Sequence, residues 1–226
     1  MIPVRQTVKF DKKLLDKDAV KIVQSLIKTG YDAYLVGGCI RDLLLGFEPK
    51  DFDIATNATP EQIHKIFKRS RIIGRRFRLV HIMFSARKFI EVATFRAGKV
   101  KTSNNGVVIR DNFYGSLKDD VFRRDFTVNG LYYDLVKSQV IDYVGGLDDL
   151  KAGEIKMIGN PKERFEEDPV RMIRAVRFKV KLSALLEQEL SQDISNNAHL
   201  LANIPPARLY EEVIKLFHND NSIEVF

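Results

Sequence analysis

The sequence contains a single cysteine among its 226 residues, which excludes an intrachain disulfide framework and fits a reducing cytoplasm. No apolar run approaches the ~18 residues that a membrane-spanning helix requires, and no signal peptide opens the chain. The sequence also lacks internal repeats and low-complexity segments. We therefore expect a soluble, cytoplasmic protein that has no membrane partner.

The composition is that of a globular protein with a basic balance. A chain of this length with 45% hydrophobic residues can bury a sizeable core and can divide into two units. Lysine and arginine number 37 against 30 acidic residues, which gives a formal net charge of +7. This balance suits a polyanionic partner, although many soluble proteins are this basic without one.

A pair of glycines lies between an expected strand and an expected helix. Ala33–Val36 is short and apolar, so it predicts a buried strand, and Gly37 and Gly38 follow it directly. Leu43–Leu45 indicates one or two helical turns that end at Gly46. Paired glycines allow a close backbone approach, and free N–H groups at a helix start favour an anion.

Two aspartates follow on the next expected strand, Lys50–Ile54. Residues i and i+2 of a strand share a face, so Asp51 and Asp53 should point the same way. Two adjacent carboxylates repel, and a divalent cation such as Mg²⁺ relieves that repulsion while also binding substrate phosphates. The alternative is a simple turn followed by two solvated aspartates. The two halves together, at this spacing, favour a metal site that faces a phosphate site.

These residues resemble a known family. Gly-Gly, Arg41-Asp42 and Asp-x-Asp together resemble the nucleotidyltransferase signature of the polymerase-beta superfamily, and residues 34–56 resemble its bacterial poly(A) polymerase and CCA-adding branch. The resemblance implies an α+β fold, with a catalytic head of mixed sheet and helices over residues 1–150. An all-helical neck would follow over residues 151–226, and the further C-terminal RNA-binding domains of the family are not apparent.

Two later segments also resemble family motifs. Residues 167–178 are similar to a nucleotide-recognition motif, which implies that Asp168 and Arg171 face the incoming base while Arg174 and Arg177 support the site. The alternative is a basic, solvated face on an amphipathic helix. Residues 123–129 are similar to the block that holds ribose and triphosphate, and this implies nucleotide-binding roles for Arg123, Arg124 and Asn129. A structural ion pair remains an alternative for one of these two arginines.

A third catalytic acid is expected from the resemblance, and two residues qualify. Asp125 is favoured because its flanking residues match the motif, whereas Glu91 lies on a strand and could equally be solvated. Cys39 is interpreted as a small buried filler, and His81 as a structural residue.

Other elements are expected from periodicity and from turn residues. They are a loose arm over 1–12, a helix over 13–28, a helix from the Thr59-Pro60 cap to Phe67, a strand-turn-strand over 71–84 around Gly74, a strand over 89–95, a loop over 97–112, a helix from Leu117, a hairpin over 132–144, a helix opened by Asp168-Pro169, and almost wholly helical structure beyond Gly146.

The resemblance implies transfer of AMP from ATP to the 3′-hydroxyl of an RNA, with Asp51 and Asp53 holding two Mg²⁺. The amides of Gly37 and Gly38, with Arg41, would cradle the triphosphate, and Asp42 would brace Arg41.

Residues 72–82 and 205–212 resemble the poly(A) polymerase version of these segments, which favours poly(A) addition over CCA addition to tRNA. A truncated nucleotide-binding or RNA-binding fragment is a further alternative. No DNA partner is expected.

Overall fold

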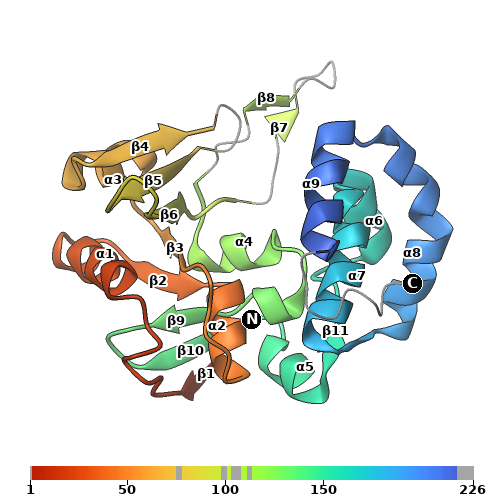
Figure 1. Cartoon of the computed structure of the whole chain (residues 1–226), viewed down its shortest axis with the longest axis horizontal. Helices are drawn as coiled ribbons and strands as arrows, with labels where there is room; N and C mark the ends of the chain where they lie inside the picture. Colours follow the sequence, from red (N-terminus) through yellow and green to blue (C-terminus); the bar gives the residue numbers. More distant parts are fainter. Residues whose placement is uncertain (1, 75–77, 98–100, 103–107, 111–113, 218–226) are drawn as a thin grey trace. The chain divides into compact units, whose positions relative to one another are not determined.

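The computed structural model describes residues 2–74, 78–97, 101–102, 108–110 and 114–217 (Figure 1). The chain forms two compact units: residues 1–124 with 129–144, and residues 125–128 with 145–226. The sequence predicts a boundary at residue 150, which falls inside helix α5 (Gly146–Ala152); the structure includes all of α5 in the second unit. The fold class is α+β, as expected. No helix among the described residues combines the length and the apolar character that crossing a membrane requires.

The first unit is built on a mixed sheet of eight strands in the order β1-β10-β9-β2-β3-β6-β5-β4. β3 and β6 are parallel, and the other neighbouring pairs are antiparallel. The strands are β1 (Val4–Thr7), β2 (Ala33–Val36), β3 (Asp53–Thr56), β4 (Ser70–Ile73), β5 (Leu79–Met83), β6 (Phe89–Thr94), β9 (Tyr132–Asp134) and β10 (Gln139–Asp142).

Helices of the first unit begin at well-defined caps. Asp16 caps α1 by accepting hydrogen bonds from the amides of Asp18 and Ala19, and Thr59 and Gln62 form the expected capping box of α3. The helical segments of this unit are α1 (Lys17–Lys28), α2 (Gly38–Leu44), α3 (Pro60–Ile66), α4 (Leu117–Phe122) and the 3₁₀ turn Thr127–Asn129, whose last residue belongs to this unit.

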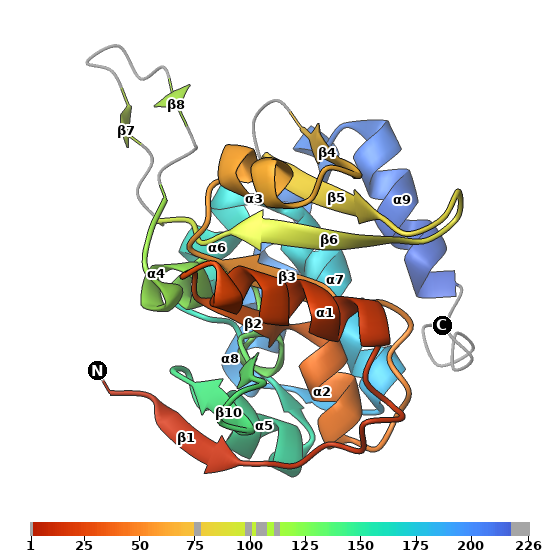
Figure 2. The same ribbon diagram turned by 90° about the vertical axis from the view of Figure 1, so that its left-hand side faces the viewer.

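The strand register divides the sheet into two faces. Leu35 pairs with Ile54, and Ile54 pairs with Val92, so these three buried side chains share one face. α1 packs against β2 and β3, and Figure 2 shows it crossing in front of these strands. Asp53 lies one residue before Ile54, so it projects on the opposite face.

Four predictions for the first unit need correction. The loose arm contains β1, an edge strand that pairs with β10; the sequence hides it because its side chains are all exposed. The first helix begins four residues later than expected, after its Asp16 cap. The expected loop 97–112 includes the short pair β7 (Lys101–Thr102) and β8 (Val108–Arg110), while its Ser-Asn-Asn-Gly centre lies outside the described residues. β3 begins at Asp53, so Asp51 precedes the strand.

The second unit is mainly helical. Its core contains Phe126, Phe165, Met172 and Phe178, all of which are buried. The prediction of an all-helical domain is wrong in one respect, because β11 and β12 pair in parallel. The remaining elements are β11 (Glu154–Ile155), α6 (Pro161–Glu167), α7 (Val170–Leu182), β12 (Leu185–Leu186), α8 (Gln188–Asn197), the 3₁₀ segment Ala198–Asn203 and α9 (Pro206–Phe217).

A buried carboxylate stabilises the junction between α4 and β9 in the first unit. Asp120 is 1% exposed and pairs with Arg123 at 2.7 Å and with Arg124 at 3.3 Å. It also accepts a hydrogen bond from the Tyr132 hydroxyl and one from the backbone N–H of Arg96. Burial acts to raise the pKa of Asp120, but Arg124 and Arg123 outweigh it, so the pKa is lowered.

Replacing Asp120 with asparagine should destabilise the first unit by about 3 to 5 kcal/mol, because two guanidinium groups lose their buried counter-charge. The folded-state pKa lies below the unfolded value of about 3.9, so this stabilisation is present at neutral pH and is lost as the pH falls through the lowered pKa. Urea unfolding at several pH values measures both effects. Lys118→Gln, at an exposed position of the same helix, is the matched control. Equal stability of D120N and the control would contradict this account.

Candidate active site

Three carboxylates gather on one side of the sheet in the first unit. Asp53 begins β3 and Glu91 lies beside it on the parallel strand β6, since Ile54 is in register with Val92. Asp51 comes two residues before Asp53. All three line a cavity of about 530 Å³. The residues around this acid cavity are Asp16, Lys50, Asp51, Phe52, Asp53, Arg87, Lys88, Phe89 and Glu91.

The electrostatics of Asp53 indicate that the cations near it do not balance the charge of the three acids. The Asp53 side chain is open to solvent on the cavity side, while protein surrounds it elsewhere. Burial raises the pKa of Asp53 to about 6, and Glu91 and then Asp51 contribute to the rise by repulsion. Arg124 acts in the opposite direction but does not cancel it. A cation in the cavity would favour the charged form of all three acids.

The donor set fits a magnesium ion that is completed by a substrate. Among the described residues, no group of three or more acidic, histidine or cysteine side chains is already arranged to hold a metal ion. Mg²⁺ does not need such a cage, because proteins usually bind it with one or two carboxylates, and substrate phosphates and water supply the remaining oxygens. The observation that supports the fit is the convergence of Asp51, Asp53 and Glu91 on one cavity, where burial and then repulsion by Glu91 raise the pKa of Asp53.

The structure places Glu91 with Asp51 and Asp53 around the acid cavity of the first unit. Asp125 belongs to the second unit, where its Oδ2 accepts hydrogen bonds from Arg174 Nε at 2.8 Å and Nη2 at 2.6 Å. Its Oδ1 accepts a third hydrogen bond from the amide of Phe126. Asp125 thus holds Arg174 within the second unit, and its role as the third acid stays a prediction.

The two glycines form a sharp turn at the start of α2. Gly37 has φ 73°, a conformation that side chains rarely adopt, and a Cβ there would lie 3.1 Å from Arg124 Nη1. This close approach lets the Arg124 guanidinium lie against the turn. The expectation of free N–H groups is wrong for Gly37, whose amide donates to Leu131 O at 2.9 Å. Gly38 is the first residue of α2.

Arg41 is held inside the first unit rather than on its surface. It is 2% exposed, its Nε donates to Asp42 Oδ1 at 2.8 Å, and its Nη1 donates to Asn129 Oδ1 at 2.5 Å. Asp42 therefore braces Arg41, as expected. This contact joins α2 to the turn before β9. Arg41 and Asn129 therefore help to hold the start of α2, where the Gly37-Gly38 turn lies, in place.

Both arginines of the 123–124 pair contact the buried Asp120, so the ion pair that the sequence allowed for one of them involves both. Arg124 also donates to the Tyr132 hydroxyl at 2.8 Å and lies over the Tyr132 ring. Burial disfavours its charge, but Tyr132 and Asp120 outweigh burial and raise the pKa of Arg124. Arg124 therefore stays cationic, and its charge acts to lower the pKa of Asp53.

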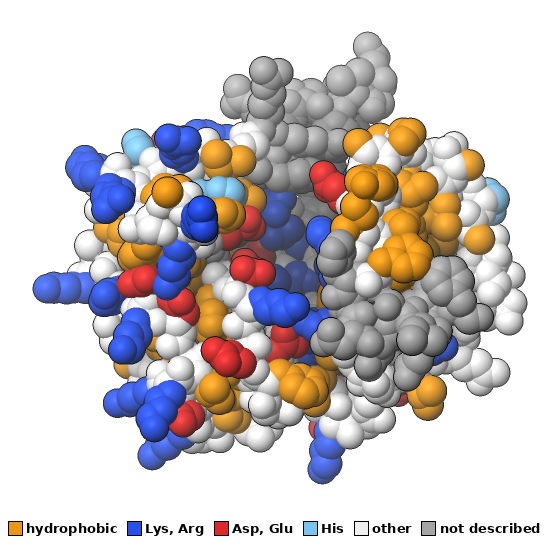
Figure 3. Space-filling model, viewed as in Figure 1, with side chains coloured by type: hydrophobic (Ala, Val, Ile, Leu, Met, Phe, Trp, Pro, Cys, Tyr) orange, Lys and Arg blue, Asp and Glu red, His pale blue; other side chains and the backbone are white. Residues whose placement is uncertain are grey.

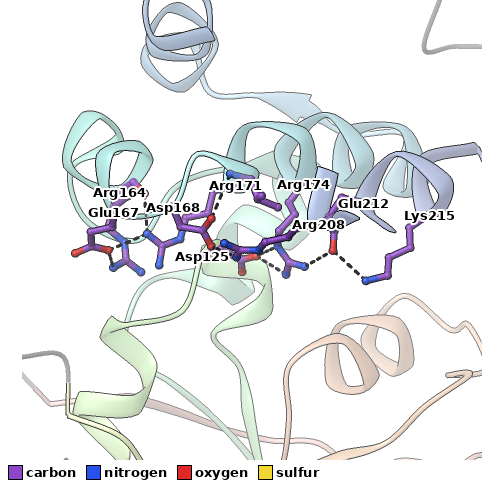
Figure 4. A network of polar contacts seen from close by, with 10 residues as sticks. Asp125, Arg164, Glu167, Asp168, Arg171, Arg174, Arg208, Glu212 and Lys215 are labelled. Carbon is purple, nitrogen blue, oxygen red and sulfur yellow. Dashed lines mark hydrogen bonds and ion pairs between the residues drawn. The ribbon is translucent and has the colours of Figure 1, made fainter. Parts of the chain in front are cut away.

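The predicted base-recognition residues form an ion-pair network in the second unit (Figure 4). Asp168 Oδ2 pairs with Arg208 of α9 at 2.6 Å. Arg171 Nη1 donates to Glu167 at 2.8 Å and to the backbone oxygen of Arg164 at 2.7 Å. α7 begins at Val170, one residue later than expected, although Asp168 Oδ1 still accepts from the Val170 amide.

α9 also contributes an acid, Glu212, to this network. Glu212 is 7% exposed and lies 3.7 Å from Arg174, 3.3 Å from Arg177 and 3.0 Å from Lys215. Arg174 and Arg177 also lie over the Phe178 ring. Both arginines thus hold α7 and α9 together, and this fits the supporting role that the resemblance implies.

Sequence reasoning missed two charged positions, Asp120 and Glu212. The spacing of Asp120 to Arg123 and Arg124 is i, i+3 and i, i+4, which is a detectable ion-pair signal on a helix.

Cys39 is the buried filler that was predicted, and burial raises the pKa of its thiol to about 12. His81 was predicted to be a structural residue, and the structure adds a contact with a residue of the acid cavity, because its Nε2 lies 3.5 Å from Glu91 Oε2.

The chain is similar to known proteins over nearly all of its length. It is 48% identical to poly(A) polymerase I of Salmonella typhi, over 98% of this chain and 50% of that protein. It is 37% identical to the CCA-adding enzyme of Lactobacillus helveticus, over 92% of this chain and 51% of that protein. The solved structure of the Bacillus stearothermophilus CCA-adding enzyme in complex with CTP matches with a TM-score of 0.79 at 37% identity, over 92% of this chain and 50% of that one.

The chain thus spans about half the length of the curated relatives that it matches. Residues 186–226 match a family described as the probable RNA and SrmB-binding site of polymerase A, in a stretch where the sequence shows only ordinary helix patterning. Residues 33–156 match the family described as the poly(A) polymerase head domain. Since this match covers more than half of the sequence, the chain belongs to the poly(A) polymerase head-domain family.

Proposed function

We propose that this chain carries the catalytic part of a template-independent polynucleotide adenylyltransferase, which adds AMP from ATP to RNA 3′ ends. The observation that supports this most directly is the acid cavity, in which Asp51, Asp53 and Glu91 repel one another and Arg124 lies nearby. Such a site suits a reaction in which a cation and a triphosphate enter together.

The higher sequence identity to a poly(A) polymerase than to a CCA-adding enzyme supports poly(A) addition. The chain is 48% identical to the Salmonella typhi poly(A) polymerase I and 37% identical to the Lactobacillus helveticus CCA-adding enzyme. CCA addition to tRNA remains the second candidate, because the similar solved structure is a CCA-adding enzyme in complex with CTP.

Two magnesium ions are the proposed cofactors, with Asp51 and Asp53 as their protein ligands. When bound, magnesium supplies Lewis-acid activation of the attacking hydroxyl and neutralises charge on the phosphates. Glu91 completes the acid cavity and accepts a hydrogen bond from the 3′-hydroxyl of the RNA, which orients that hydroxyl.

The reaction is an in-line substitution at phosphorus. The RNA 3′-oxygen forms a bond to the α-phosphorus of ATP, the bond from that phosphorus to the bridging oxygen breaks, and pyrophosphate leaves. The hydroxyl proton passes to Glu91 or to water. Arg124, which stays cationic and lies against the Gly37 turn, stabilises negative charge on the phosphate oxygens.

The RNA would approach a basic surface. Lysine and arginine side chains are prominent over the first unit in Figure 3. Exposed basic residues over α1, α3, β4 and the turn before β6 include Lys21, Lys28, Lys65, Lys68, Arg69, Arg71 and Arg87. Such residues neutralise phosphates without reading sequence, so binding should weaken as salt rises.

Asp51→Asn, Asp53→Asn and Glu91→Gln should each lower AMP incorporation by about 100-fold or more. Each substitution removes one carboxylate charge from the acid cavity, where the proposed reaction takes place. Incorporation of labelled ATP into a short RNA, with and without Mg²⁺, measures this. D148N, at a position outside the acid cavity, is the control and should retain parent activity.

Asp125→Asn distinguishes the two candidates for the third acid. It should lower thermal stability through the lost Arg174 contact, and should lower the rate at saturating substrates much less than E91Q does. A parent-like rate for E91Q combined with an inactive, folded D125N would reverse the assignment.

Nucleotide choice provides a separate test of the role proposed for Asp168 and Arg171. If these residues recognise adenine, Arg171→Ala should reduce the preference for ATP over CTP by about 10-fold, the effect of losing one good base contact. Lys179→Ala, an exposed position on the same helix, is the matched control. Competition assays with the two nucleotides provide the ratio, and an unchanged ratio in R171A would assign this helix to a structural role.

A further inference from the structure

An exposed aromatic ring lines the acid cavity. Phe89 is the first residue of β6 and is 49% exposed, whereas Phe52, the other aromatic lining residue, is 9% exposed. All the other lining residues in the described part of the chain carry a charge. Phe89 is therefore the one apolar surface that this cavity offers to an incoming molecule.

The strand fixes Phe89 relative to the acids. Residues i and i+2 share a face, so Phe89 and Glu91 project on the same side of β6, with Cα atoms roughly 6.6 Å apart. Glu91 in turn lies beside Asp53 on the neighbouring strand. A molecule that packs on the Phe89 ring thus has its adjoining atoms within reach of the carboxylates.

His81 of β5 supports the ring from one side. The two ring centroids lie 4.1 Å apart, with an angle of 17° between the planes. The same imidazole lies 3.5 Å from Glu91 through its Nε2. His81 therefore links the orientation of the aromatic ring to that of the acid, and the exposed part of Phe89 is available for stacking.

Cationic side chains accompany the ring. Lys50 and Arg87 line the same cavity and are exposed. Lys88 also lines it, but its ammonium is shared between Asp16 and Asp18 at 2.8 Å each. An aromatic platform flanked by cations is the arrangement that binds single-stranded nucleic acid without reading its sequence.

We propose that Phe89 is the stacking platform for the base of the 3′-terminal RNA nucleotide, and that Lys50 and Arg87 bind the phosphates next to it. This inference rests on the proposed function and adds the place of the acceptor strand. Base and 3′-hydroxyl belong to the same nucleotide, so stacking the base on Phe89 brings the hydroxyl toward Glu91 and Asp53. The platform accepts any base, because every base has a π-face.

The experiment compares two RNA primers that differ only in the last nucleotide: one ends in adenosine, and the other carries ribose without a base at that position. For each primer, fluorescence anisotropy in Mg²⁺ gives the affinity, and labelled ATP gives kcat/KM. The proteins are the parent, F89A, F89W and F47A. Phe47 is 55% exposed and does not line the acid cavity, which makes F47A the matched control.

The parent and F47A should bind the complete primer about 5-fold to 100-fold more tightly than the baseless primer, the range expected for one base stack. F89A should lose most of this difference and bind both primers alike, and F89W should keep it. The KM for ATP should stay within about twofold in F89A. Melting curves verify that each variant folds.

Equal affinity of the parent for the two primers would overturn the proposal, as would an undiminished difference in F89A. Failure of the proposed function has a different signature, because a parent that transfers no AMP to either primer can still show the affinity difference and its loss in F89A. If Phe89 instead serves only to pack β6 against β5, F89A will lower the melting temperature and leave the primer difference unchanged, which also overturns the proposal.

Discussion

Repulsion between carboxylates is the constraint on which the proposed site depends. Asp53 and Glu91 lie side by side because β3 and β6 are parallel and in register, and Asp51 adds a third charge beside them. The pKa of Asp53 is raised to about 6, first by burial and then by Glu91, so the first unit has carboxylates whose charge it does not balance. Arg124 reduces this imbalance without removing it. A cation that arrives with a nucleotide would complete the balance.

Three other acids among the described residues are matched by cations. Asp120 has Arg123 and Arg124, Asp125 has Arg174, and Glu212 has Arg174, Arg177 and Lys215. Such pairs hold elements together, and removing one partner leaves a costly charge. The contrast between these balanced acids and the acid cavity is what separates structural from functional carboxylates here, and it explains why Glu91 rather than Asp125 is proposed as the third acid.

The sequence predicts most elements of the first unit, because periodic and capped segments carry local signals: β2, the Thr59 capping box and the 132–144 hairpin all form as expected. β1 escapes prediction because an exposed edge strand has no buried alternation. The site is predicted through Asp51, Asp53 and the glycine turn. The sequence names Glu91 as a candidate third acid but does not show that it lies beside Asp53, because strand order brings the two together. The partners of Asp120 and Asp168 depend on tertiary packing that a motif does not encode.

The most direct test of the central claim is thermal unfolding of the parent chain and D53N, with and without Mg²⁺ at constant ionic strength. The parent melting temperature should rise as Mg²⁺ is added, because the ion binds the folded cavity. D53N should start at a higher melting temperature than the parent without metal, since one like charge is removed, and should gain less from Mg²⁺. An identical Mg²⁺ response of the two proteins, or a D53N that is less stable without metal, would contradict the account.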